Sequence, residues 1–343
     1  MEQRAYYSIR EVTEMICNER ILVLSALDEY LAVLPTGNWI GGSANRIKDL
    51  TYNDQGEPLL IQVNDLTQWV RSIHINSYQS FNFDSIDTDS YSNGFSIIII
   101  PAFSSIHLSF AIYKATISLP LKQPIIGWVA GSDCGTDAMR ESVVIDGSTG
   151  EFYPERVVVM HCALQDGYKA WYDIINPFEV DYTQPRFKFQ RSSFNITECS
   201  VLERGRSADL TSEEIERAKN SRITFKEYAA EHGLLLRKAF PFITEIRGEK
   251  VPLAIMLMDE GRGIVCASPT IPGLEYSVAK YATDEEFLCS THSDTAILTI
   301  HCINTLYSAP SDIASYGEVA RYLYNLVTIR LHISKALTSV FES

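Results

Sequence analysis

The sequence lacks the surplus of basic side chains that nucleic-acid-binding proteins use. Of its 343 residues, 29 are Lys or Arg and 43 are Asp or Glu, which gives a net charge of −14 and an isoelectric point of about 5.0. Clustered Lys and Arg are needed to neutralise nucleic-acid phosphates and to hold an anionic membrane surface. The composition therefore argues against both a nucleic-acid partner and a membrane partner.

Long apolar runs are also missing. The first seven residues have no apolar core of a signal sequence, and no later apolar run approaches the roughly 20 residues that cross a bilayer. We therefore expect a cytoplasmic protein. The seven cysteines are scattered and contain no Cys-x-x-Cys pair, so in a reducing compartment we expect free thiols.

No motif identifies a reaction or a metal site on its own. The glycine-containing segments lack the spacing and the lysine of nucleotide-binding loops. His161-Cys162 and His301-Cys302 each end an apolar segment typical of a strand, and adjacent strand residues point to opposite faces. Neither pair can hold one ion by itself, so we predict no metal site.

Short aliphatic segments bounded by Gly, Pro, Asn or Asp are abundant, and they predict buried strands. Their nearly continuous hydrophobicity indicates sheets that are covered on both faces. We therefore predict a mixed α+β fold with largely buried β-sheets and flanking helices. The strand candidates are residues 95–101, 124–129, 156–162, 252–258 and 295–303.

Capping boxes predict where helices begin, and a change of composition indicates where the chain is divided. Ser8 and Glu11 have capping-box spacing and predict a helix over residues 9–18. Around residues 201–236 the composition becomes charged and contains two more capping boxes, Thr211 with Glu214 and Thr224 with Glu227. We predict two packed and related halves, residues 1–205 and 206–343; a helical insertion inside one domain stays open as the alternative.

A cysteine in a loop of small residues suggests one enzymatic hypothesis. Cys134 lies in such a loop directly after a predicted strand, where a thiolate would be accessible. His107 and His161 are the available bases for a cysteine-dependent hydrolase or transferase. The alternative is an ordinary turn, because glycine, serine and aspartate are typical of turns in general.

Five segments, taken in order, resemble the FIST proteins (F-box and intracellular signal transduction). The likeness spans most of the chain. The segments are residues 37–42, 101–107, 124–128, 146–151, and 317–320 followed by Asn325.

The resemblance implies a cytoplasmic sensory module that binds a small ligand and passes its state to a signalling protein partner. The ligand is amino-acid-like in many members and haem in some. This chain has Leu326 and Val327 where the family has a Gln-Thr pair, so we place the ligand site near the N-terminus. We expect no cofactor, because His161 and His301 lie in apolar segments with no basic cluster nearby for haem propionates.

The N-terminal glycine-rich segment has the composition of a pocket wall. Two glycines allow close approach, a tryptophan offers a stacking face, and neutral polar groups flank them. The alternative is a tight turn into a strand with a core tryptophan. A structural or partner-binding module without ligand is the third functional hypothesis. The candidate ligand-binding residues are Asn38, Trp39, Gly41, Gly42, Ser43, Arg46 and Glu318.

Overall fold

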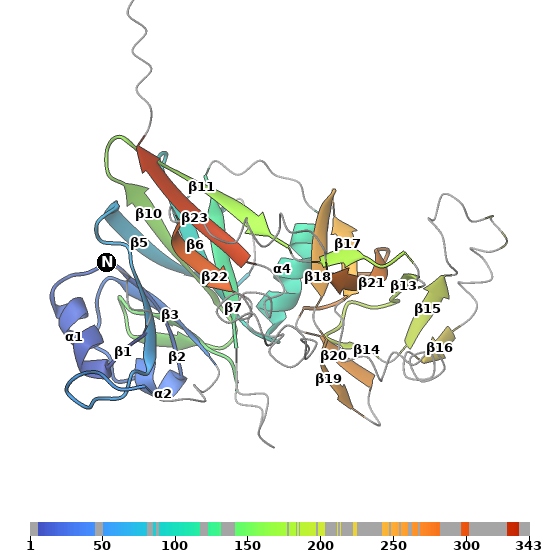
Figure 1. Ribbon diagram of the computed structural model, residues 1–343, viewed down its shortest axis with the longest axis horizontal. Helices are drawn as coiled ribbons and strands as arrows, with labels where there is room; N and C mark the ends of the chain where they lie inside the picture. Colours follow the sequence, from blue (N-terminus) through green and yellow to red (C-terminus); the bar gives the residue numbers. More distant parts are fainter. Residues whose placement is uncertain are drawn as a thin grey trace, which may run out of the picture.

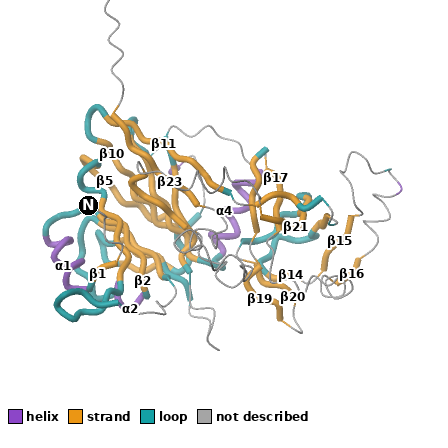
Figure 2. Tube along the Cα trace, in the orientation of Figure 1, coloured by secondary structure: helices purple, strands orange, loops and turns teal. Residues whose placement is uncertain are grey.

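The computed structural model describes residues 6–281, 296–301 and 328–335. Within the first range it leaves out residues 45–50, 81–84, 87–88, 117–122, 132–140, 177, 183, 185, 197, 203–210, 212, 214–221, 225–241, 247, 254, 260–262 and 267. The fold is mixed α+β, as predicted (Figure 1), and strands far outnumber helices in the described part of the chain (Figure 2).

Two sheets form a sandwich in the N-terminal half. The first has the order β1 (Tyr6–Tyr7), β4 (Ile61–Asp65), β2 (Leu22–Ala26), β3 (Trp39–Ser43), β8 (Val144–Asp146) and β9 (Glu151–Tyr153). The second has the order β5 (Val70–Tyr78), β10 (Val157–Leu164), β6 (Gly94–Pro101) and β7 (Ile125–Ala130). The pairs β2–β3 and β6–β7 are parallel, and the other pairs are antiparallel.

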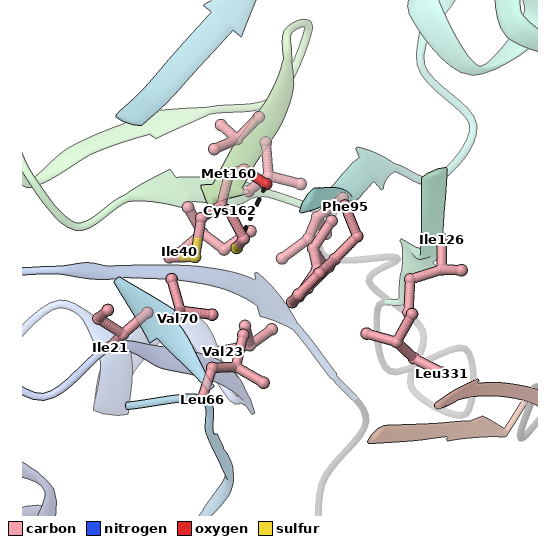
Figure 3. Close-up of a cluster of buried hydrophobic side chains, with 14 of the residues drawn as sticks. Ile21, Val23, Ile40, Leu66, Val70, Phe95, Ile126, Met160, Cys162 and Leu331 are labelled. Atoms are coloured by element: carbon pink, nitrogen blue, oxygen red, sulfur yellow. Dashed lines mark hydrogen bonds between the residues drawn. The ribbon is translucent and has the colours of Figure 1, made fainter. Parts of the chain in front are cut away.

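The inner faces of the two sheets make one apolar core. Val23 and Ile40 from the first sheet meet Phe95 and Met160 from the second, and all four are fully buried (Figure 3). Alternate residues of β2 and β3 point into the core, since strand side chains alternate between faces. The core therefore fixes the spacing of the two sheets.

Helices cover the outer faces of the sandwich. Helices α1 (Ile9–Cys17) and α2 (Asp28–Leu31) pack on the first sheet, and α4 (Ser105–Thr116) packs on the second. Ser8 and Glu11 form the predicted capping box at the start of α1. The sandwich thus has four layers, and none of the described helices is long and apolar enough to cross a membrane.

The remaining strands form three further sheets. A three-stranded sheet has the order β11 (Tyr168–Ile175), β23 (Thr328–Lys335) and β22 (Ala296–His301), and its Leu331 extends the sandwich core. A larger sheet runs β16 (Arg222–Thr224), β15 (Glu198–Leu202), β13 (Arg186–Lys188), β21 (Glu275–Tyr281), β17 (Phe242–Ile246) and β18 (Glu249–Leu253), with β12 (Phe178–Val180) also paired to β21. The last contains β14 (Asn195–Ile196), β20 (Gly263–Cys266) and β19 (Ile255–Asp259).

Most of the predicted strands are confirmed. The strand predicted over residues 252–258 is instead divided between β18 and β19. Thr224 ends β16, and the helices predicted from the two later capping boxes lie outside the described residues. Strand β23 pairs with β11 from the N-terminal half, while the division at residue 205 stays a prediction.

Candidate functional site

Trp39 occupies the position of a core tryptophan. Its side chain is 1% exposed, and its indole Nε1–H donates to the carbonyl of Pro35 over 2.9 Å. Gly147 lies directly against the ring, because a Cβ added there would be 2.2 Å from Trp39 Cδ2. The indole is enclosed by protein, so its position matches the core alternative and not a stacking face for a ligand.

The two glycines after Trp39 serve the packing of layers. A Cβ on Gly42 would lie 2.8 Å from Ile99 Cγ2 and 3.2 Å from Ala130 Cβ, both in the opposite sheet. A Cβ on Gly41 would lie 3.2 Å from Trp39 Cζ3 on the helix side of the strand. The missing side chain at Gly42 therefore lets the two sheets approach closely. Asn38, just before the strand, is exposed.

Ser43 lies where the carboxyl ends of three strands meet. Its hydroxyl donates to the carbonyl of Gly131 over 2.7 Å and accepts from the Val143 N–H at 3.0 Å. Ser142 makes a matching pair of bonds, donating to the Ala130 carbonyl at 2.7 Å and accepting from the Ala102 N–H at 3.0 Å. The two buried serines therefore tie together the ends of β3, β6 and β7.

His107 stands beside this edge, in the first turn of α4. Its Nδ1 accepts from the N–H of Phe103 at 3.4 Å, so the neutral ring carries its proton on Nε2. Burial lowers the pKa of His107 to about 4. Phe103 has a φ of 60°, in the left-handed region that residues with side chains seldom adopt, as is frequent at functional sites.

An aromatic side chain from later in the chain completes the edge. The ring of Phe194 lies 4.9 Å from that of His107 and 5.2 Å from that of Phe103. Phe194 immediately precedes β14, so the contact joins the sandwich to the sheets that follow it. We define the strand-end site by five residues: Ser43, Phe103, His107, Ser142 and Phe194.

His161 belongs to a different environment. It is 0% exposed on the outer face of the second sheet, whereas Cys162 points into the core between the sheets, as strand alternation predicts. A continuous hydrogen-bond chain passes through its two ring nitrogens. In order, this His161 chain consists of Gln123, Ser96, His161, Tyr78 and Asp89.

The two candidate bases lie at opposite ends of β6. His161 pairs with Ser96 near the start of that strand, and His107 follows its end. Ser96 is also in register with Ile125, at the start of β7, so His161 lies roughly 17 Å along the sheet from the end of β7. Gly131, which leads into the segment with Cys134, therefore leaves the sheet at the edge that carries His107.

Several predicted residues lie outside the described part of the chain, namely Cys134, Arg46 and Glu318. Ser96, Ser142, Phe194 and Gln123 were not predicted from the sequence. Only Ser96 carries a signal, as a polar residue inside an apolar strand; the others acquire their roles from contacts across the fold. No group of three His, Cys, Asp or Glu side chains in the described segments is arranged to hold a metal ion.

Residues 7–334 match the model of a family of unknown function, DUF6976, and the chain belongs to that family. No curated protein and no solved structure matches the chain. The likeness to FIST proteins stays a prediction.

Proposed function

We propose that this protein is a cytoplasmic sensor that binds a small molecule at the strand-end site and signals through a separate protein partner, without catalysing a reaction. The observation that carries this proposal is the buried, neutral His107 at a contact between two parts of the fold. Phe194 approaches it from the sheets that follow the sandwich. A ligand bound there would act on both parts at once, as a sensor requires.

The chemistry of the edge favours a small ligand with both an acceptor and an apolar group. Because His107 Nδ1 accepts from the Phe103 N–H, the proton on Nε2 is the one that would donate to a carboxylate or carbonyl oxygen of a ligand. Phe103 and Phe194 supply apolar contact. Carboxyl ends of strands are common ligand sites in open sheets. These features suit the amino-acid-like ligand that the resemblance to FIST proteins implies, and they require no cofactor.

The proposal is tested with the twenty standard L-amino acids as probes. We expect at least one to raise the thermal unfolding midpoint, because a ligand that binds only the folded state stabilises it. Native mass spectrometry of the purified full chain checks in addition for a molecule already bound.

Phe194→Leu keeps an apolar group and removes the ring, so it should weaken binding at least tenfold. Phe152→Leu, at an exposed phenylalanine on β9, is the matched control and should leave binding unchanged. Equal affinity in the Phe194→Leu variant, or no bound molecule and no stabilising probe, would contradict the proposal.

One observation favours a second candidate function, a cysteine-dependent hydrolase or transferase. His107 and Gly131 share one edge, and Cys134 follows Gly131 by three positions in the sequence. We propose that Cys134 is nevertheless not a nucleophile, so its rate of alkylation by iodoacetamide should follow the ordinary thiol pKa of about 8.5. If the pH midpoint of Cys134 alkylation lies far below that value, and the His107→Gln variant restores the ordinary value, the result would favour the enzymatic function.

A further inference from the structure

A row of polar side chains crosses the outer face of the second sheet. His74 on β5, His161 on β10 and Ser96 on β6 are in register, so their side chains stand next to one another. Apolar residues such as Val159 and Ile98 occupy the next row of the same face. His161 and Ser96 are both 0% exposed, and their polar atoms must be paired inside the protein.

The direction of each hydrogen bond in the His161 chain follows from its acidic end. Tyr78 Oη–H donates to Asp89 Oδ2 over 2.7 Å, which uses the only phenolic proton. His161 Nε2–H must therefore donate to Tyr78 Oη, at 3.2 Å. His161 Nδ1 then carries no proton, and it accepts from Ser96 Oγ–H at 2.8 Å.

Gln123 closes the chain at its buried end. Its Nε2–H donates to Ser96 Oγ over 2.9 Å, and the residue is 6% exposed. The other amide atom, Oε1, is buried and has no hydrogen-bond partner. An unpaired buried acceptor is unfavourable, so this atom needs an explanation.

We propose that the His161 chain is a proton-driven switch with two hydrogen-bonded states. In the second state a proton from solvent binds His161 Nδ1, which then donates to Ser96 Oγ. The Ser96 hydroxyl can no longer donate to His161, so it turns toward Gln123. The Gln123 amide rotates, so that Oε1 accepts from Ser96 Oγ–H in the second state while Nε2–H gives up the bond that it donates to Ser96 Oγ in the first.

The groups around His161 favour the neutral form of its ring at physiological pH. Burial, and next to it the neighbouring His74, lower the pKa of His161 to about 4, while Asp89 opposes the shift. Burial also raises the pKa of Tyr78, so its proton stays in place.

Other described side chains around the His161 chain leave this charge balance unchanged. The ring of Tyr91 contacts His74, at a centroid distance of 5.1 Å. Helix α4 contributes Phe110 and Tyr113 to the same face. Among the side chains that the structure describes, the acquired imidazolium therefore faces one carboxylate, that of Asp89, through Tyr78.

The switch is tested by a pH titration of the full chain, followed by NMR with ¹⁵N in the histidine rings and the glutamine amides. At pH 7 we expect the Nε2–H form of His161. On acidification, Nδ1 of His161 and the side-chain amide of Gln123 should shift with one midpoint, while the amide of Gln62 on β4 stays unchanged. An Nδ1–H form at pH 7, an unresponsive Gln123, or unfolding before the two signals shift would overturn the proposal.

Two variants sharpen the test. Gln123→Met removes the second acceptor, so the midpoint of His161 should fall by about one pH unit, a tenfold loss of proton affinity. Gln62→Met is the matched control and should leave the midpoint in place. In Ser96→Ala, the Gln123 signal should no longer follow His161. An unchanged midpoint in Gln123→Met refutes the switch, and if that variant does not fold, the shared wild-type midpoint decides.

Discussion

The two faces of the β5–β10–β6–β7 sheet bury their side chains in different chemical environments. On the inner face, Phe95 and Cys162 lie in an apolar core, where the backbone supplies the polar groups that need hydrogen-bond partners. On the outer face, their chain neighbours Ser96 and His161 are as deeply buried but belong to a hydrogen-bond chain. Stability on the inner face depends on filled volume, and on the outer face it depends on matched donors and acceptors.

The largest expected effect comes from emptying the inner face. Phe95→Ala should lower the free energy of unfolding by about 3–5 kcal/mol, because it removes a buried ring and leaves a cavity. Ser96→Ala, at the next residue of the chain, should lower the free energy of unfolding by about 1–3 kcal/mol, because it leaves two buried polar atoms unpaired. Phe152→Ala, at an exposed ring, is the control for both. Urea unfolding measures all three, and an equal loss for Phe95→Ala and Ser96→Ala would erase the distinction between the faces.

Acid should weaken the protein through its buried histidines. The pKa values of His161 and His107 lie near 4 in the folded protein against 6.5 ordinarily, so the unfolded chain binds more protons between these values. The contribution of the two neutral histidines to the free energy of unfolding is fully present above pH 6.5. As the pH falls toward 4, the free energy of unfolding decreases by about 1 kcal/mol per pH unit for each histidine.

Urea unfolding at pH 7, 6 and 5 measures this slope. None of the described side chains in the inner core is a titratable base, so Phe95→Ala should shift the whole profile downward and leave the slope between pH 6.5 and 5 intact. His107→Gln should reduce the slope by about half. A flat wild-type profile in that range would contradict the lowered pKa values.

The smallest effect concerns reactivity and leaves stability unchanged. Cys162 is fully buried, and burial raises the pKa of its thiol, whereas Cys17 at the end of α1 is exposed. Iodoacetamide at pH 8 should therefore modify Cys17 in the native protein and spare Cys162. Labelling of Cys162 should increase in Phe95→Ala, where the core is opened. Mass spectrometry of the peptides reads both outcomes, and equal rates for the two thiols would be the contrary result.

Local patterns in the sequence predicted much of the architecture. The capping box at Ser8 and Glu11 formed as expected, since its partners are three residues apart. Apolar composition predicted that β6 and β10 are buried on both faces. The division between β18 and β19 was missed, because residues 252–258 have the apolar character of one continuous strand.

The candidate site was less accessible to prediction from sequence. Glycine and tryptophan after Asn38 have the composition of a pocket wall, yet Gly42 serves the approach of two sheets and Trp39 fills a core. A close approach between layers and a ligand contact both favour glycine, so composition does not distinguish them.

The sequence by itself determined the class of the fold and the opposite faces of His161 and Cys162, because periodicity and capping act between neighbours in the chain. Only the tertiary structure decided that Phe194 meets His107 and that Gln123 meets Ser96. The physical reason is that these contacts join segments far apart in the sequence, whose approach depends on how whole layers pack. A hydrogen bond or a ring contact needs positions within a few ångströms, which only the packed sheets provide.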